Sequence, residues 1–282
     1  MPVFNGESFL ENRLKNILEQ TFFDFDLIIS NNASTDNTEK ICKQFANKDN
    51  RIKYFNQQKN YGVERNFYFV LNKSNSPYFV WAGVDDIWEK DFLKETLNFL
   101  ELEKKFVGCI GEVETYGEVK NREVSNKKIS DLIKRIRLGE YGPQEATGEY
   151  EQKVKTYLNR NSAQALYGVF RTGSLKKSYI QKLFLGVDLA IILNFLKYGD
   201  YHVIKKKFIK FNIGGFSSKG ITTSTKKLGH TWTGRLFPYY PFTKWCFENI
   251  GVKIFLKNIF HFIKLNITGE LAIIYDILVL KK

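Results

Sequence analysis

The feature that most constrains the fold of this chain is an alternation of two patterns over residues 1 to 111. Short apolar runs, typical of buried strands, alternate with segments in which apolar residues recur every three or four positions, as in amphipathic helices. Such an alternation indicates βα units around a mostly parallel sheet. The runs are 25–30, 52–55, 78–82 and 106–110, and the helical patterns are 10–18, 38–45, 63–71 and 92–100.

Two of the loops after these runs are candidate binding segments, because α/β sheets bind ligands beyond the carboxyl ends of their strands. Residues 31–36 read Asn-Asn-Ala-Ser-Thr-Asp, and residues 83–86 read Gly-Val-Asp-Asp. An N-cap and turn for the next helix would explain the first loop equally well. The adjacent carboxylates of Asp85 and Asp86 repel each other, which favours a divalent cation there over the alternative of a solvated turn.

Residues 112–160 are charged and interrupted by glycines, as expected of an inserted or acceptor-side region. Residues 184–196 then predict a helix that is apolar nearly all round except for Asp188 near its start. This carboxylate either interacts with the helix dipole or acts as a general base in a cleft. No glycine-rich dinucleotide or P-loop motif occurs, which argues against those two classes of nucleotide-binding protein.

The charge of the chain is concentrated towards its C-terminal end. Of the formal +13, residues 201–282 contribute +11, from 14 Lys and Arg against three Asp and Glu. Such a basic segment suggests a polyanionic partner, either nucleic acid or an anionic membrane surface. The three widely spaced cysteines fit a reducing cytosol rather than a disulfide framework. No signal peptide or membrane-spanning run is recognisable, so we expect a cytoplasmic protein, soluble or peripheral.

Several motifs in the same order resemble the inverting family-2 glycosyltransferases of the GT-A fold. They are Pro2-Val3-Phe4-Asn5-Gly6-Glu7, the segment 20–36, Asn60-x-Gly62 and the segment 78–88, which ends in Asp85-Asp86-Ile87-Trp88. Residues 166–171, 186–188 and 199–200 are similar to the acceptor half of bacterial members. The resemblance covers roughly residues 1 to 215 and rests on the combination of motifs rather than on any one of them.

The resemblance implies an α/β, GT-A-like fold with a mostly parallel central sheet flanked by helices. It divides the chain into a nucleotide-sugar-binding half at 1–111, an acceptor-binding half at 112–228 and a basic, aromatic helical tail at 229–282. The implied reaction moves a sugar from a nucleotide-diphosphate donor to a glycan or lipid-linked acceptor, in a metal-assisted inverting single displacement with Mn²⁺ or Mg²⁺. The alternative is a non-catalytic, membrane-associated glycan-assembly partner that keeps the fold.

The resemblance also implies roles for individual residues. Pro2, Phe4 and Glu7 would line the nucleotide pocket, and Arg65 would face the phosphates. Asn31 stands where the family usually has an Asp that contacts the base, and Val84 stands where many relatives have an acid or a His. Asp85 and Asp86 would hold the metal and the sugar diphosphate, and Asp188 matches the catalytic base. The first strand is short here or begins upstream.

The segment from Gly229 onward is both aromatic and basic. Its helical spacing places Val252, Phe255, Leu256, Ile259 and Ile263 on one face, and Lys253, Lys257, His261 and Lys264 on the opposite one. Such a helix fits an anionic membrane surface, although a helix packed on the body of the protein would show a similar pattern. Nucleic acid is not expected as a partner, because no DNA-binding or RNA-binding motif accompanies the charge.

Overall fold

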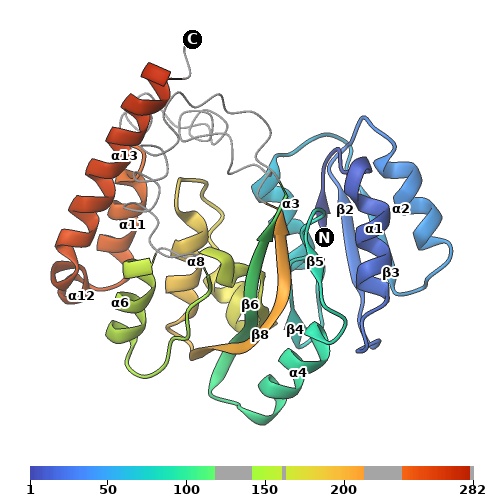
Figure 1. The fold of residues 1–282 in the computed structure, drawn as a ribbon, viewed down its shortest axis with the longest axis horizontal. Helices are drawn as coiled ribbons and strands as arrows, with labels where there is room; N and C mark the ends of the chain where they lie inside the picture. The colour runs from blue at the N-terminus through green and yellow to red at the C-terminus, as the bar shows by residue number, and fades with distance from the viewer. Residues whose placement is uncertain (118–141, 161–162, 213–236, 280–282) are drawn as a thin grey trace. The chain divides into compact units, whose positions relative to one another are not determined.

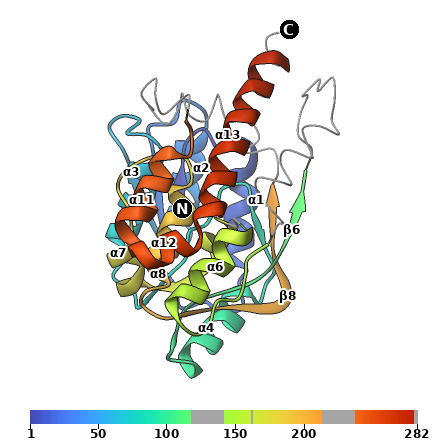
Figure 2. The same ribbon diagram turned by 90° about the vertical axis from the view of Figure 1, so that its left-hand side faces the viewer.

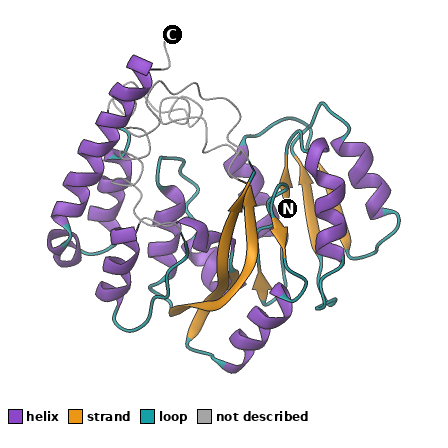
Figure 3. Ribbon diagram, in the orientation of Figure 1, coloured by secondary structure: helices purple, strands orange, loops and turns teal. Residues whose placement is uncertain are grey.

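The structure is a computed structural model that describes residues 1–117, 142–160, 163–212 and 237–279. These residues belong to two compact units. The first comprises Met1–Tyr116, Tyr167–Gln181 and Tyr201–Asn212, and the second comprises Gly117–Leu166, Lys182–Asp200 and Ile213–Lys282. The sheets lie in the first unit, whereas the described part of the second consists mainly of helices (Figure 3).

The first sheet of this unit is parallel and contains β1 (Pro2–Val3), β2 (Leu27–Asn31) and β3 (Ile52–Asn56), in that order. The connecting helices are α1 (Glu7–Leu18) and α2 (Thr38–Ala46), which lie side by side, and α3 (Val63–Lys73) packs against β1 and β2 (Figure 1). The strands and helices predicted over residues 1–73 are therefore confirmed. Because the strands are parallel, the loops that follow β1, β2 and β3 meet at one edge.

The second sheet has the order β4-β7-β6-β8-β5, and its pairings of defined register are antiparallel. The expected parallel sheet is thus found in β1 to β3, whereas the β4–β7, β6–β7 and β5–β8 pairings are antiparallel. The strands are β4 (Tyr78–Phe79), β5 (Ile87–Trp88), β6 (Phe106–Tyr116), β7 (Val169–Arg171) and β8 (Asp200–Asn212). Helix α4 (Phe92–Leu102) precedes β6, a 3₁₀ turn (Ala163–Tyr167) precedes β7, and α7 (Thr172–Ser178) follows it.

The predicted strand at 78–82 is shorter than its apolar run. Only Tyr78 and Phe79 pair with β7. Trp81 instead turns into the core, where its indole N–H donates to the carbonyl oxygen of Phe67 at 3.3 Å and its ring meets that of Phe79 edge-on. An apolar run can therefore mark buried side chains that do not belong to a strand.

The helices of the second unit are α6 (Tyr150–Arg160), α8 (Val187–Phe195), α11 (Tyr240–Asn249), α12 (Val252–Lys257) and α13 (Ile259–Val279). The all-round apolar helix predicted at 184–196 is confirmed as the largely buried α8. Helix α13 runs beside α11 (Figure 2), and the Asn266 amide donates to the Thr243 hydroxyl at 2.8 Å. Within the part of the chain that the structure describes, no helix has the length and hydropathy needed to cross a membrane.

The predicted tail is helical over its described residues, but the prediction of a single amphipathic helix near 252–264 is wrong. The chain forms two helices there, α12 and α13, separated at Asn258. Phe255, assigned to the apolar face, is buried and stacks on Phe262 with ring centroids 4.5 Å apart. His261, assigned to the charged face, is half-buried. Trp232 and the rest of 229–236 lie outside the described residues.

Candidate active site

The loops after β1 and β2 hold each other in place. Asn5, whose φ of 49° lies in the left-handed region, donates from its backbone to the Ser34 hydroxyl at 2.9 Å. Its side-chain oxygen accepts from the backbone N–H of Thr35 at 2.9 Å. The N-cap position of α2 is Asn37, whose side chain makes no capping hydrogen bond. The Asp36 carboxylate before it accepts from the N–H of Thr38 at 3.0 Å, so the loop 31–36 also supplies a turn at the start of α2. One set of hydrogen bonds therefore both begins the helix and shapes the edge of the sheet.

The predicted nucleotide-pocket residues of β1 and α1 lie at this edge. Phe4 is exposed, Pro2 is half-buried in β1, and Glu7 is exposed at the start of α1. The Glu7 carboxylate accepts from the backbone N–H and the side-chain amide of Asn37 at 3.1 and 2.5 Å. This carboxylate is therefore engaged in joining α1 to α2, while Phe4 presents a free aromatic surface.

Asn31, predicted to contact the base, is fully buried. Its amide nitrogen donates to the Tyr54 hydroxyl at 3.2 Å and to the Asn56 side-chain oxygen at 3.0 Å, and its oxygen accepts from the N–H of Ser34. Both amide hydrogens are thus used within the chain, so only the remaining lone pair of the oxygen is left for a ligand. The Asn31 side chain is therefore held mainly by partners within the chain.

Arg65 lies exposed in the first turn of α3, which follows the Asn60-x-Gly62 motif. The amide nitrogen of Asn32 donates to the Asn60 side chain and to the carbonyl oxygen of Gly62, at 2.9 and 3.1 Å. Asn66, next to Arg65, is buried and donates to the carbonyl oxygen of Ser30 at 3.0 Å. The first turn of α3 is therefore fixed against the end of β2, with the guanidinium of Arg65 turned to solvent.

The acidic loop, defined as residues 83–88, is clamped at both ends by α1. The Arg13 Nε donates to the carbonyl oxygen of Gly83 at 2.8 Å. Asn16 exchanges two hydrogen bonds with the backbone of Trp88, at 2.8 and 2.9 Å. The Tyr116 hydroxyl of β6 donates to the Asp85 carbonyl oxygen. The backbone of the loop is thus held from two elements that are distant in sequence.

The two carboxyl groups of this loop have different surroundings. Asp85 is half-buried, whereas Asp86 is buried and lies so close to Gly83 that a Cβ there would be 2.2 Å from the carboxylate oxygen Oδ2. Burial raises the pKa of Asp86 to about 7, although the buried guanidinium of Arg13 opposes the shift. Burial also raises the pKa of Asp85. Burial thus opposes the ionisation of both carboxyl groups relative to free ones, and a divalent cation nearby would favour it.

Asp188 belongs to the second unit, in the first turn of α8. It follows Gly186, whose φ of 91° lies in the left-handed region, and precedes the buried Leu189 and Ala190. The Asp188 side chain is exposed, yet crowding by protein atoms around it reduces its hydration and raises its pKa. It is thus an accessible carboxylate of increased basicity, as a general base requires.

A family model described as Glycosyl transferase family 2 matches residues 1–175. The chain belongs to this family. The assignment from the motifs is confirmed, and the match includes every predicted donor-site residue from Pro2 to Asp86. Asp188 lies beyond the matched residues, so its role stays a prediction.

Curated relatives of this family-2 chain are glycosyltransferases. The dTDP-rhamnosyl transferase RfbG of Shigella flexneri is 35% identical over 105 residues, which cover 36% of this chain and 36% of the relative. The GalNAc(5)-diNAcBac-PP-undecaprenol beta-1,3-glucosyltransferase of Campylobacter jejuni is 24% identical over 212 residues, or 73% of this chain and 61% of the relative. The matched segment spans only 14% to 40% of the length of three curated relatives, RfbG included.

Solved structures of low sequence identity share the fold. S. aureus TarS 1–349 in complex with UDP-GlcNAc aligns with a TM-score of 0.58 at 15% identity, over 99% of this chain and 82% of TarS. The mannosyltransferase PcManGT from Pyrobaculum calidifontis, in complex with GDP-Man and Mn²⁺, aligns with a TM-score of 0.53 at 11% identity, over 95% and 72%. The GT-A-like α/β fold expected from the motifs is confirmed.

Arg13 and Asn16 were not among the predicted site residues of this family-2 chain. The sequence does contain a signal for Arg13, because it lies among Leu10, Leu14 and Ile17 on the apolar face of α1. A charge at such a position needs a buried partner. Asn16 and Tyr116 have no comparable signal, since their partners lie 72 and 31 residues away along the chain.

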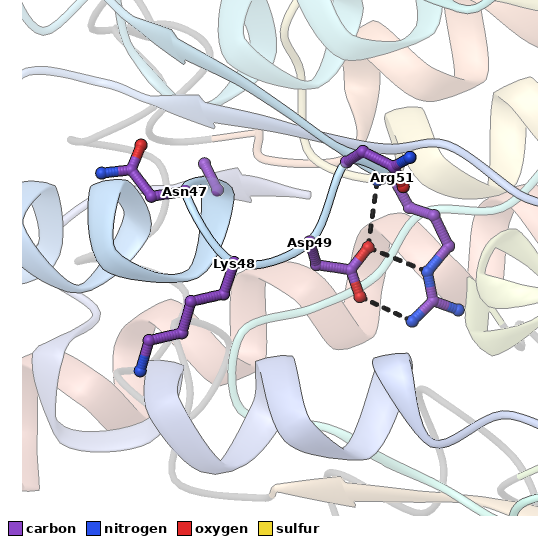
Figure 4. A pocket seen from close by; sticks show the side chains of 6 residues that line it. Asn47, Lys48, Asp49 and Arg51 are labelled. Atoms are coloured by element: carbon purple, nitrogen blue, oxygen red, sulfur yellow. Dashed lines mark hydrogen bonds and ion pairs between the residues drawn. The ribbon is translucent and has the colours of Figure 1, made fainter.

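A surface hollow lined by residues 46–51 contains none of the predicted site residues (Figure 4). Arg51 closes it with two hydrogen bonds to the carboxylate of Asp49, at 2.7 and 3.0 Å. The Arg51 guanidinium also lies 4.8 Å from the centre of the Phe25 ring. This hollow is the outer side of the turn between α2 and β3, and its Asp49 and Arg51 side chains are already paired with each other.

Proposed function

We propose that this family-2 chain transfers a sugar from a nucleotide-diphosphate donor to a glycan or lipid-linked acceptor, by a metal-assisted inverting single displacement. The observation that carries the proposal is the acidic loop, in which Asp85 and Asp86 are held in a clamped backbone in the same unit as the β1, β2 and α3 loops. The names of the relatives support a donor of this class, since RfbG is called a dTDP-rhamnosyl transferase and TarS was solved with UDP-GlcNAc.

A divalent cation, Mn²⁺ or Mg²⁺, fits the carboxylates of Asp85 and Asp86. Among the described residues, no three His, Cys, Asp or Glu side chains gather into a metal site by themselves. A cation on this pair would therefore take its remaining ligands from diphosphate and water oxygens, which is how Mg²⁺ is commonly held in phosphate-transfer sites. When bound, the cation neutralises charge on the diphosphate leaving group. PcManGT, solved with GDP-Man and Mn²⁺, supports a metal of this kind.

Other donor-side residues have roles that fit their positions. The exposed ring of Phe4 offers a stacking surface for the base, beside Pro2 and Glu7 at the same sheet edge. Asn31 stabilises this edge through its hydrogen bonds to Tyr54, Asn56 and Ser34, and its side-chain oxygen keeps one lone pair that a ligand could use. The exposed Arg65 guanidinium suits the phosphates, because its planar donors match phosphate oxygens. We assign residues 1–111 to donor binding on these grounds.

Asp188 is the proposed catalytic base. As the acceptor oxygen attacks the anomeric carbon, the bond from that carbon to the diphosphate oxygen breaks, and the hydroxyl proton moves to the Asp188 carboxylate. Attack on the face opposite the leaving group inverts the anomeric configuration. We assign 112–228, which contains α8, to acceptor binding; residues 118–141, 161–162 and 213–228 of this segment lie outside the described ones.

The proposed function also includes association of the protein with a membrane that contains the acceptor. The Campylobacter jejuni relative is named for an acceptor linked to PP-undecaprenol, which supports a lipid-linked acceptor here. The basic tail, 229–282, would bring the enzyme to an anionic membrane surface at its cytoplasmic face, where nucleotide sugars are present. No role for nucleic acid is proposed.

Thermal unfolding with UDP-, GDP- and dTDP-sugars tests the proposal, because a ligand that binds only the folded state raises its unfolding temperature. We expect one sugar nucleotide to stabilise the protein only with Mn²⁺ and to be hydrolysed slowly. Asp85→Asn should abolish both effects. Asp26→Asn, an exposed carboxylate in a long 3.8 Å ion pair, is the matched control and should keep both.

The alternative, a non-catalytic glycan-assembly partner, makes a different prediction in the same experiment. It allows stabilisation by a nucleotide sugar but no hydrolysis or transfer at any Mn²⁺ concentration. That result with the wild-type protein, across the donor panel and with lipid-linked acceptors supplied, would overturn the transferase proposal.

A further inference from the structure

Helix α13 exposes a row of large apolar side chains at helical spacing. This row, the α13 stripe, consists of Phe260, Ile263, Ile267, Leu271 and Ile274, which are 81%, 47%, 53%, 49% and 52% exposed. Successive members lie three or four residues apart and therefore share one side of the helix. Isolated exposed apolar residues are ordinary in proteins, whereas a continuous row marks a surface that binds something.

The opposite side of α13 is already packed within the second unit. It is lined by Phe262, Leu265, Thr268, Ala272 and Ile273, all buried. Phe262 stacks on Phe255 of α12 and lies 6.3 Å from Phe242 of α11 between ring centroids. At Gly269 a Cβ would come within 2.7 Å of the Tyr239 ring, so the helix approaches its neighbour closely there. The α13 stripe is thus not the face that fixes the helix to the protein.

The described charged side chains of α12 and α13 taken together are mostly positive: Lys253, Lys257 and Lys264 against Glu270. Lys264, next to Ile263, is exposed, and so is Lys253 of α12. Helix α12 also exposes Val252 and Leu256, at 53% and 58%. Lys257 is paired with Glu151 at 2.6 Å, and Glu270 is half-buried at the border of the stripe. Exposed apolar side chains flanked by lysines are typical of helices that lie in the interface of an anionic membrane.

We infer that the α13 stripe is a lipid-binding face, inserted among the headgroups of an anionic membrane, with Lys264 of the same helix at its border and Lys253 exposed on the neighbouring α12. The inference develops the membrane association included in the proposed function. A second copy of the chain is a poorer occupant for two reasons. One row of five side chains is far smaller than the roughly 20–30 residues per side of a stable protein interface. Two copies that each carry +13 would also repel each other.

Vesicle flotation with the full chain tests this inference. Wild-type protein should bind vesicles of 70% phosphatidylcholine and 30% phosphatidylglycerol, and bind pure phosphatidylcholine weakly. Phe260→Ser/Ile267→Ser should lower the partition coefficient by about tenfold or more, because two inserted apolar side chains are lost. Phe23→Ser, at a 76% exposed aromatic of the first unit, is the matched control and should bind like the wild type.

Two further measurements complete the test. Lys253→Gln/Lys264→Gln should reduce the preference for anionic vesicles and its dependence on salt, while circular dichroism and thermal unfolding of all variants match the wild type. Binding by the Phe260/Ile267 variant equal to that of wild type would overturn the inference. So would a dimer in light scattering that these substitutions convert to monomer, because it would identify a second copy as the occupant.

Donor hydrolysis in solution separates this inference from the proposed function. A variant that loses vesicle binding should hydrolyse the soluble nucleotide sugar at the wild-type rate, because its substitutions lie in α13. If the wild-type protein hydrolyses the nucleotide sugar but does not bind vesicles, only the lipid-binding face is refuted. If it binds vesicles but does not hydrolyse the nucleotide sugar, only the transferase proposal is refuted.

Discussion

The guanidinium of Arg13 lies over the indole of Trp88, with its Cζ 4.2 Å from the ring centre. Arg13 belongs to α1, and Trp88 ends the acidic loop that begins at Gly83, whose carbonyl oxygen accepts from the same guanidinium. One buried side chain of the first helix thus contacts both ends of the loop that carries Asp85 and Asp86. The position of the two carboxylates therefore depends on a residue more than 70 positions earlier.

Replacement of Arg13 should affect both stability and donor use. We expect Arg13→Ala to lower the free energy of unfolding by about 2–3 kcal/mol, because it removes two hydrogen bonds of a buried cation, to the Gly83 carbonyl oxygen and the Asn16 side chain, and its contact with Trp88. Arg13→Lys, which keeps the charge but not the planar stack on Trp88, should unfold closer to wild type yet need more Mn²⁺ for donor hydrolysis. Urea unfolding and Mn²⁺ titration of hydrolysis are the measurements.

An exposed basic residue on the same helix is the control. Lys15→Ala removes only an exposed pair with Glu11 and should leave both measurements unchanged. Wild-type metal dependence in Arg13→Ala would contradict the view that Arg13 positions the loop.

A side chain at Gly83 should displace the Asp86 carboxylate, since a Cβ there would lie 2.2 Å from its Oδ2. We expect Gly83→Ala to raise the Mn²⁺ concentration for half-maximal donor hydrolysis by about tenfold or more, through the altered carboxylate position. Gly173→Ala is the matched control, because a Cβ at Gly173 has no atom within 4 Å. Equal metal dependence of the two variants would show that the position of Asp86 does not matter.

Replacement of the proposed base should slow transfer without loss of donor binding. Asp188→Asn should lower kcat by about 10²- to 10⁴-fold, the usual contribution of a general base, while thermal stabilisation by donor and Mn²⁺ stays at the wild-type value. Glu248→Gln, an exposed acid in the same unit, should retain full activity. Near-normal kcat in Asp188→Asn would exclude Asp188 as the base.

The half-buried imidazole of His261 should make stability depend on pH. Burial lowers the pKa of His261 from 6.5 to about 4, with Lys264 adding to the effect, so the folded protein holds a neutral imidazole. Between these two pH values the unfolded chain binds a proton that the folded chain does not. Stability from this group is therefore complete above pH 6.5 and declines as the pH falls towards 4, by up to about 3 kcal/mol.

His261→Gln removes this titration and is the comparison that isolates it. Urea unfolding of both proteins from pH 7.5 to 4 should show a shallower loss of stability in the variant. Parallel curves would mean that His261 titrates alike in the folded and unfolded chain.

Local patterns in the sequence were sufficient to predict many of the helices and strands. The three- and four-residue spacings of α1 to α4 and of α8, and the runs at β2 and β3, correspond to elements with the expected bounds within a few residues. These features depend on neighbours along the chain, which periodicity reports directly. The ordered motifs also identified the family, because motif order is a property of the sequence itself.

Contacts between distant segments determined the rest. Periodicity could not show that Phe255 would stack on Phe262 across a break in the tail helix, or that Asn31 would use its amide on Tyr54 and Asn56. It also could not show that Arg13 would hold the acidic loop, although its place on an apolar face signalled a buried partner. In each case the deciding free energy comes from burial and hydrogen bonding between side chains far apart in sequence. Those interactions exist only once the chain has folded.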